Sequence, residues 1–510
     1  MARLLLGFAS RYMLELTVFV CGALVMIYEI IGSRLLSPFI GVSTYVWTSL
    51  IGVILASLSL GYWLGGKTAD RRPNVGVLAA AIFIAGGCVS VTILLKDIFL
   101  SFIASAHTGL EVKSVIASLL LFAPASVALG FVTPYAVKLK MSALADSGKT
   151  VGGLFAFSTV GSIVGTFAAG FFLIPFVGSV RTLYLIAGTL IILSLLLVPF
   201  AVSRLQISVL VLFVLALAAS EFSIYFVREK SGLHDIDTEY SRVQVFETTD
   251  PATGRRIRGL ATDPYFTQSA VFLDSDEPVL KYSRYYHLLR HFKPDFQNTV
   301  MIGGAGFTFP REYLRAYPQA RINVVEIDPQ MTEIARRFFR LQDDARLSIT
   351  HRDGRVFLDQ APAGAYDVVL MDAFGSLFNV PYQLTTVEAV REISRVLAPD
   401  GVVIFNLGSA ITGDGSKFLQ AELKTYQEIF PHVYLFKVNS DYADERLQNL
   451  IIVGAKGDVP AAQSSDEAIN TLLSHRYTGD IPLTVPALTD DLAPVEYYNS
   501  IAQDLYVSTR

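Results

Sequence analysis

The stretch TVMIGGAGFTFPREYLRAYPQARINVVEID, residues 299–328, decides the fold of the C-terminal half of this 510-residue chain. Residues 300–302 are a short apolar run, typical of a buried parallel strand. Three glycines follow it at once: Gly303, Gly304 and Gly306. Glycine allows a tight turn and a close approach of the backbone to a ligand. Residues 309–316 then suit a helix whose first amides point at that turn.

A second apolar run, residues 322–325, ends in Glu326 and Asp328. An acid at the tip of the second strand, about 20 residues after the glycines, is placed to accept hydrogen bonds from ribose hydroxyls. We therefore predict a ligand of the adenosine type. The alternative is a glycine turn of the kind found in any α/β domain.

The composition indicates a membrane protein with a soluble part. The chain is 52% hydrophobic and 17% charged, with a mean hydropathy of +0.47, which is too apolar for an ordinary soluble protein. The net charge of -4 gives no basic field for nucleic acid. Cys21 and Cys88, the two cysteines, both lie in apolar segments and imply no metal site.

Residues 1–227 are expected to form an all-α polytopic membrane domain embedded in a lipid bilayer. A bilayer-spanning helix needs about 20 apolar residues. Seven stretches meet that requirement: 14–35, 45–64, 75–95, 114–134, 151–176, 183–201 and 207–227. Glu15, Glu29 and Arg34 lie in or beside the first stretch, and they indicate either a polar site between helices or charges at the interface.

The loops between these spans differ in their content of lysine and arginine. The more basic set includes the N-terminus, which the positive-inside rule places in the cytoplasm. Seven spans would then leave the C-terminal domain outside, in conflict with a cytosolic nucleoside ligand. We predict a cytoplasmic C-terminal domain, and residues 97–106 are a candidate for a missed short or re-entrant element.

Residues 228–510 read as a soluble α/β domain. Residues 228–278 are expected to form a small β-hairpin subdomain, residues 279–457 a Rossmann-like core that begins with a helix at 279–292, and residues 458–510 a polar tail.

Acids follow two further strands of that core. Asp353-Gly354 follows a strand at 347–351, where the Asp suits either an adenine amino group or a simple turn. Asp372 ends the apolar strand at 366–371, and functional side chains gather at such strand ends. The strands 433–436 and 449–453 fit an antiparallel edge.

The motifs IGGAG, VVEID, HRDG and VVLMDAF, taken in this order, resemble the spermidine synthase family of polyamine aminopropyltransferases. The resemblance covers roughly residues 238–457. Together with the membrane spans, the stretch VWTSLIGVILASLSLGYWLGG and the tail LTDDLAPVEY, the chain resembles a bacterial membrane-integral subgroup. The resemblance implies a multi-pass protein of the bacterial inner membrane, and it allows a homodimer.

The resemblance also implies the reaction and its residues. The donor would be decarboxylated S-adenosylmethionine, the acceptor a small-molecule amine and the product methylthioadenosine, with no metal. Asp372 would be the catalytic base, and Tyr286 and Tyr442 would bind the substrate. If substitution of Asp372 leaves turnover intact, the base lies elsewhere, with Asp490 or Asp491 in the tail as the alternatives, or the domain only binds its ligand. The resemblance assigns the cofactor to seven residues: Gln268, Gly303, Gly304, Gly306, Glu326, Asp353 and Gly354.

Two acids of the family pattern are missing here. The acid of the family's glycine loop falls on Gly306, and the second acid of its DSSD motif falls on Gly375. Use of the decarboxylated donor and of a diamine acceptor is therefore open. The alternatives are another S-adenosylmethionine-dependent enzyme, such as a methyltransferase using intact S-adenosylmethionine, or a transporter or sensor whose domain binds a nucleoside or polyamine without chemistry.

Overall fold

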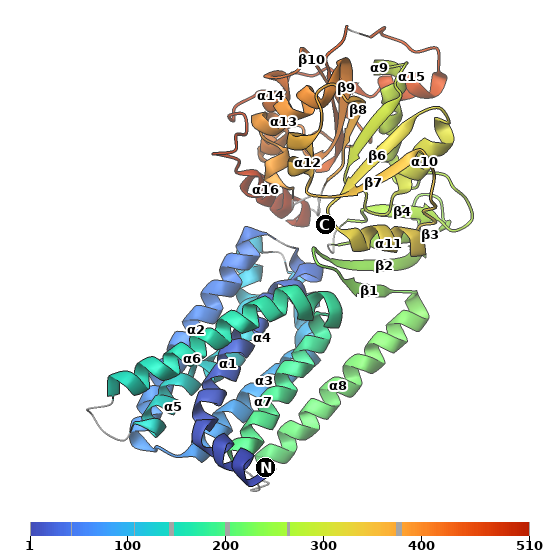
Figure 1. The fold of residues 1–510 in the computed structure, drawn as a ribbon. Helices are drawn as coiled ribbons and strands as arrows, with labels where there is room; N and C mark the ends of the chain where they lie inside the picture. Colours follow the sequence, from blue (N-terminus) through green and yellow to red (C-terminus); the bar gives the residue numbers. More distant parts are fainter. Residues whose placement is uncertain are drawn as a thin grey trace. The chain divides into compact units, whose positions relative to one another are not determined.

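The chain folds as two compact units, Met1–Lys230 and Ser231–Arg510. This computed structural model, shown in Figure 1, describes residues 2–41, 43–106, 108–141, 147–198, 204–262, 266–373, 380–458 and 460–508. The second acid of the family motif falls on Gly375. This position belongs to residues 374–379, which lie outside the described residues.

The first unit is entirely helical. Its helices are α1 Ala2–Ile40, α2 Thr44–Arg71, α3 Val75–Ala104, α4 Leu110–Gly130, α5 Val132–Lys140, α6 Ser147–Ala168, the π-helix η2 Ala169–Val177, α7 Ser179–Leu197 and α8 Arg204–Ser231. Within the described residues, six segments are long and apolar enough to cross a membrane: Tyr12–Ile40, Thr44–Arg71, Val75–Ala104, Leu110–Lys140, Ser147–Val177 and Ser179–Leu197. These six agree with the first six predicted spans.

The remaining predictions for this unit need two adjustments. The seventh predicted span coincides with α8, but the apolar part described there, Ile207–Ala219, is shorter than the other six. The suggestion of a separate element at residues 97–106 was wrong, since α3 continues without a break to Ala104. Lys96 pairs with Asp97 within that helix, so these two charges do not end it.

Glycines set the contacts between two pairs of helices. A Cβ added to Gly161 of α6 would lie 2.0 Å from the carbonyl oxygen of Phe19 in α1, and one added to Gly61 of α2 would lie 2.3 Å from that of Val127 in α4. No side chain fits at either position, so the backbones pack directly, as small residues allow in membranes. Glu15 of α1 is also paired with Lys140 of α5.

The second unit begins with a four-stranded antiparallel sheet in the order β1-β2-β3-β4. Its strands are β1 His234–Asp237, β2 Arg242–Thr249, β3 Arg256–Ala261 and β4 Ser269–Phe272. Inward residues such as Val243 and Val245 alternate along β2 and pack on Ile334 and Phe338 of helix α11, Pro329–Phe338. The alternating sequence of the predicted β-hairpin subdomain indicates three strands, which correspond to β2, β3 and β4. The structure adds a fourth strand, β1.

The main sheet has eight strands in the order β12-β10-β11-β9-β8-β5-β6-β7. Its strands are β5 Asn298–Ile302, β6 Arg321–Glu326, β7 Leu347–His351, β8 Tyr366–Met371, β9 Leu397–Ser409, β10 His432–Lys437, β11 Gln448–Ala455 and β12 Arg476–Tyr477. The five from β5 to β9 are parallel. Beyond them β11 pairs antiparallel with β9, β10 with β11, and β12 with β10. The predicted antiparallel edge is confirmed.

Helices cover both faces of this sheet (Figure 1), because successive residues of its buried strands point to opposite sides. One core joins the sheet to α12 Gly354–Gln360, α13 Val387–Val396 and α14 Lys417–Gln427. The other joins it to α10 Thr308–Ala316, α9 Leu289–Phe292 and α15 Glu467–Leu473. Helix α16, Val495–Ser508, follows the tail.

The predicted helix at residues 279–292 is mostly a 3-10 helix, η3 Lys281–Leu288, which continues into α9. Its tyrosines reach partners on different elements. The Tyr285 hydroxyl donates to the Lys437 carbonyl at 2.8 Å, while the Tyr282 hydroxyl lies 3.3 Å from Asp372. We attribute the tighter winding to these tertiary contacts, which override the 3.6-residue period.

Candidate active site

The strand order reverses between β5 and β8, where the chain leaves β5 toward β6 and β7 and later returns to β8 and β9. Ligands of open α/β sheets bind at this switch point, beyond the carboxyl ends of the strands. Gly303 ends β5 there with φ 96, and a Cβ on it would lie 2.3 Å from the Asp372 carbonyl oxygen. The glycine is therefore required by both conformation and space.

The loop after Gly303 is strained. Ala305 and Phe307 both adopt left-handed backbone, with φ 44 and 52, a conformation that costs a non-glycine residue free energy and clusters at functional sites. The buried Phe307 ring fills the space beside Gly304, where an added Cβ would lie 2.7 Å from it.

Glu326, at the end of β6, holds this loop in place. One carboxylate oxygen accepts the amides of Gly304 and Ala305 at 2.9 and 3.0 Å, and the other accepts the amide of Asp328 at 3.0 Å. Burial raises the pKa of Glu326, and the three amides oppose that rise. Its predicted contact with ribose stays a prediction, for which Oε1, with a single amide donor, retains acceptor capacity.

A cavity of about 120 Å³ opens beside the loop. The described part of its wall contains five of the ten predicted site residues: Gln268, Tyr286, Gly303, Gly304 and Asp372. Apolar residues complete much of it, among them Phe266, Leu280, Met301 and Phe309. Of the described residues in this wall, Asp372 is the one that carries a carboxyl group.

Asp372 sits at the end of β8 with its carboxyl group buried. Its Oδ1 accepts a hydrogen bond from Asn406 Nδ2 at 3.0 Å, and its Oδ2 accepts one from the Tyr282 hydroxyl at 3.3 Å. Burial raises the pKa of Asp372 to about 7, and the hydrogen bond from Asn406, together with the nearby hydroxyl groups of Tyr286 and Tyr282, limits the rise. A carboxyl group that titrates near neutrality is suited to general-base chemistry.

Tyr286 faces the same carboxyl group. Its hydroxyl is buried and has no partner at ordinary hydrogen-bond distance in the described part of the chain. Burial is the main cause that raises the pKa of the Tyr286 phenol, and the charge of Asp372 raises it further. The phenol therefore stays protonated. A buried donor without a partner is costly, and a substrate atom in the cavity would satisfy it. Gln268, also predicted, donates its Nε2 to the Thr262 hydroxyl at 2.6 Å.

The missing acid of the glycine loop has a steric reason. A Cβ on Gly306 would lie 2.7 Å from Cβ of Ser269, the first residue of β4, and 3.3 Å from Phe339. The Ser269 hydroxyl accepts the Gly306 amide at 3.0 Å. The small sheet thus occupies the space that a loop carboxylate would need.

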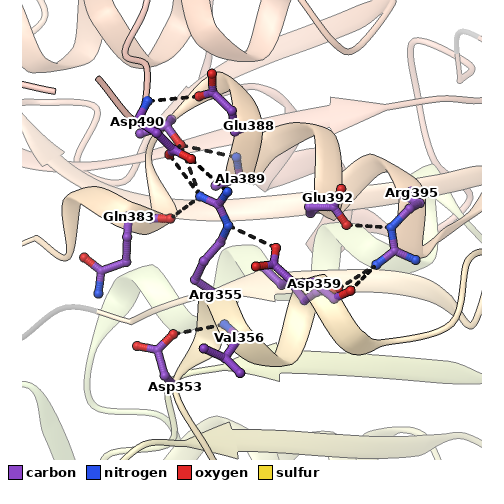
Figure 2. Close-up of polar contacts among 12 residues, drawn as sticks. Asp353, Arg355, Val356, Asp359, Gln383, Glu388, Ala389, Glu392, Arg395 and Asp490 are labelled. Carbon is purple, nitrogen blue, oxygen red and sulfur yellow. Dashed lines mark hydrogen bonds and ion pairs between the residues drawn. The ribbon is translucent and has the colours of Figure 1, made fainter. Parts of the chain in front are cut away.

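Asp353 and Gly354 begin α12 and lie outside the described wall of the cavity. The Asp353 carboxylate caps this helix by accepting the Val356 amide at 3.0 Å (Figure 2). A Cβ on Gly354 would meet Ile302 at 2.6 Å, so packing on β5 explains this glycine. The adenine contact predicted for Asp353 stays a prediction.

Asp490 is held in a polar cluster (Figure 2). Arg355 of α12 donates two hydrogen bonds to its carboxylate, each at 3.0 Å, and the Thr386 hydroxyl donates a third at 2.6 Å. The pKa of Asp490 is lowered, mainly because its carboxylate accepts hydrogen bonds from the Arg355 guanidinium. We conclude that Asp490 anchors the tail, and its suggested role as an alternative base stays a prediction.

Tyr442 does not join the other predicted residues. It is absent from the described wall of the cavity, and the Arg446 guanidinium covers its ring at 3.9 Å. The sequence reasoning instead missed Tyr282, Ser269, Asn406 and Asn449. Asn406 directly follows the apolar run 402–405 within β9, and a polar residue at that point was the signal that could have identified it.

The fold and site define a protein with an apolar helical unit and an α/β domain that carries a buried carboxyl group at the switch point of its sheet. The family model for the spermine/spermidine synthase domain matches residues 280–440. The chain is 26% identical over 263 residues to a polyamine aminopropyltransferase of Vibrio vulnificus, covering 51% of this chain and 83% of the relative. It is 25% identical over 430 residues to polyamine aminopropyltransferase 1 of Streptomyces coelicolor, covering 78% of this chain and 76% of the relative.

A crystal structure of a probable spermidine synthase from Corynebacterium glutamicum is similar with a TM-score of 0.41 and 22% identity, covering 53% of this chain and 94% of that one. The family model and the sequence relatives therefore support a domain of the spermidine synthase type over residues 280–440 of this chain.

Proposed function

We propose that the C-terminal domain transfers an aminopropyl group from decarboxylated S-adenosylmethionine to an amine and releases methylthioadenosine. The observation that carries the proposal is Asp372, a buried carboxyl group with a pKa of about 7 at the switch point of the sheet. The names of the relatives, polyamine aminopropyltransferases, support the same reaction.

The chemistry needs a neutral amine in the cavity. Its nitrogen lone pair forms a bond to the carbon beside the sulfonium, and the electrons of the breaking carbon–sulfur bond go to sulfur, which becomes a neutral thioether. The nitrogen then carries a positive charge and must lose a proton. Asp372 accepts that proton as a general base. The glycine loop, Glu326 and Asp353 hold the adenosine part, with Gly354 shaping the adjacent helix start.

The test is a product assay on the full-length protein in detergent. Purified protein is incubated with decarboxylated S-adenosylmethionine and a panel of monoamines and diamines, and methylthioadenosine and the alkylated amine are quantified. The key variant is Asp372→Asn, and the matched control is Asp343→Asn, whose carboxylate is exposed on the surface. Loss of product in the first variant alone supports the proposal.

A methyltransferase is the second candidate, and the steric exclusion of an acid at Gly306 favours it. A loop carboxylate would repel the carboxylate of intact S-adenosylmethionine, and here that repulsion is missing. The same panel with intact S-adenosylmethionine decides between them: S-adenosylhomocysteine with no methylthioadenosine would replace our proposal. Nucleoside binding without either product would indicate a sensor or transporter.

The cellular placement is also proposed here. The six apolar helices are consistent with membrane insertion, and we place the chain in the bacterial inner membrane with the C-terminal domain in the cytoplasm, where the donor is made. We retain the boundaries 1–227, 228–278, 279–457 and 458–510, and a homodimer as the assembly to test. A reporter fused after residue 510 that is active only outside the inner membrane would contradict the placement.

A further inference from the structure

Two asparagine side chains form a chain of hydrogen bonds that ends at the buried carboxyl group of Asp372. Asn406, a buried residue of β9, donates its Nδ2 to Asp372 Oδ1 at 3.0 Å. Its own Oδ1 accepts a hydrogen bond from Nδ2 of Asn449 at 3.1 Å. Asn449 lies on β11, the neighbouring strand, so the sheet itself sets the spacing of the two amides.

This chain of hydrogen bonds fixes which atom of each group faces the next. Asn406 cannot turn its amide around without pointing its NH₂ group at the NH₂ group of Asn449 and its oxygen at the carboxyl group. Asp372 Oδ1 therefore remains an acceptor whether or not the carboxyl group is ionised, since a proton on Oδ1 would meet the Asn406 donor. The free position for a proton is Oδ2.

The surroundings of Oδ2 are suited to a change of protonation. The Tyr282 hydroxyl lies 3.3 Å from Oδ2 and also 3.3 Å from the carbonyl oxygen of Gln268. Its single proton can be donated to one of them at a time. It can point to Oδ2 while Asp372 is ionised, and to Gln268 once Oδ2 carries a proton.

We propose that Oδ2 of Asp372 is the atom that takes the proton from the attacking amine, and that Asn406, backed by Asn449, is the positioning residue that directs the proton there. The proposal rests on the proposed aminopropyl transfer. In that step the amine nitrogen bonds to carbon, the carbon–sulfur electron pair goes to sulfur, and the N–H proton of the new ammonium goes to Oδ2.

Few other groups could produce the same pH dependence. Among the described residues, the titratable side chains that face Asp372 are Tyr282 and Tyr286, both from η3. Burial keeps the pKa of each phenol well above its usual range, so neither ionises near neutrality. From β9 and β11 the described side chains that line the cavity are Asn406 and Asn449, which are neutral.

The experiment compares three leucine variants of the full-length protein: Asn406→Leu, Asn449→Leu and the control Asn323→Leu. Asn323 lies on β6 of the same sheet and is bonded to Thr350 and Tyr366, away from Asp372. Turnover is measured from pH 5 to 9 with the Michaelis constant for the donor. A hydrogen bond to a charged group that is worth about 1.5 kcal/mol moves a midpoint by about one pH unit.

Asn406→Leu should raise the pH midpoint of turnover by about one unit, because the carboxylate loses a donor, and should lower kcat at pH 7 about fivefold. The Michaelis constant for the donor should not change. Asn449→Leu should shift the midpoint in the same direction by less, and Asn323→Leu should leave it unchanged. A purely structural role would lower the yield of folded protein without moving the midpoint.

A second readout does not depend on turnover. The carbonyl band of the protonated carboxyl group, assigned in infrared difference spectra by its loss in Asp372→Asn, gives the titration of Asp372 directly. If the wild type makes no product, the proposed function fails and this titration still tests the positioning. An unchanged titration midpoint in both Asn406→Leu and Asn449→Leu, with normal binding of methylthioadenosine, would overturn the inference.

Discussion

Asp372→Asn should abolish turnover and stabilise the C-terminal domain above pH 7. In the folded protein burial raises the pKa of Asp372 to about 7, above its ordinary value of 3.8. Between those two values the folded state binds more protons than the unfolded state, so stability falls as the pH rises. Below about pH 4 there is no such loss, and above about pH 7 the loss is complete.

The size of this effect follows from the two pKa values. Each pH unit between the folded and unfolded pKa corresponds to about 1.4 kcal/mol, so the ionised carboxyl group lowers the free energy of unfolding by ~4 kcal/mol at most. Asparagine keeps the shape and the contact with Tyr282 but carries no charge. The variant should therefore gain up to ~4 kcal/mol at pH 8 and nothing at pH 4, while turnover falls about 100- to 10,000-fold.

The assay is scanning calorimetry of the full-length wild type and variant across pH 4 to 8. The transition of the C-terminal domain is recognised because methylthioadenosine raises its temperature. Only the difference between the two proteins is interpreted, since other buried acids such as Glu422 cancel in it. If the variant is no more stable than the wild type at pH 8, the reasoning that burial destabilises the ionised carboxyl group of Asp372 is refuted.

Three further substitutions test the rest of the site. Glu326→Ala should weaken methylthioadenosine binding about 10- to 100-fold in calorimetric titration, because the loop amides lose a charged partner; unchanged affinity would contradict the role of this acid. Gly306→Asp should lower the free energy of unfolding by about 1–3 kcal/mol through overpacking, and adding Ser269→Gly should recover part of that loss in denaturant titrations. Asp490→Asn should cost about 1 kcal/mol or less, since its ion pair with Arg355 is partly exposed, and kcat per folded molecule should stay within twofold of the wild type.

The sequence was sufficient for features that depend on local pattern. The apolar run and glycines of residues 299–306 predicted strand β5 and its turn, and the apolar runs ending in Glu326 and Asp372 predicted β6 and β8. These strands are buried on both faces, so their continuous apolar character has one interpretation. The six long apolar segments were equally clear, because length and hydropathy alone identify them.

The sequence was insufficient where the site depends on long-range packing. Ser269 meets Gly306 and Asn449 meets Asn406 only because separate strands bring them together. No spacing along the chain records such contacts. Tyr442 was assigned by resemblance alone, and the fold turns it toward Arg446. Tyr286 was assigned to the site by resemblance, whereas Tyr282, which also lines the cavity, was not predicted.

The bond between Arg355 and Asp490 joins residues that are 135 positions apart. During synthesis a domain folds as its chain emerges, yet the start of α12, with Asp353 at its cap, gains this anchor only after residue 490 has been made. A chain that ends before residue 490 would contain the glycine loop and Asp372, but its helix α12 would lack the ion pair with Asp490. Helix α12 of such a chain should open more readily, and limited proteolysis near α12 should be faster than in the full-length protein.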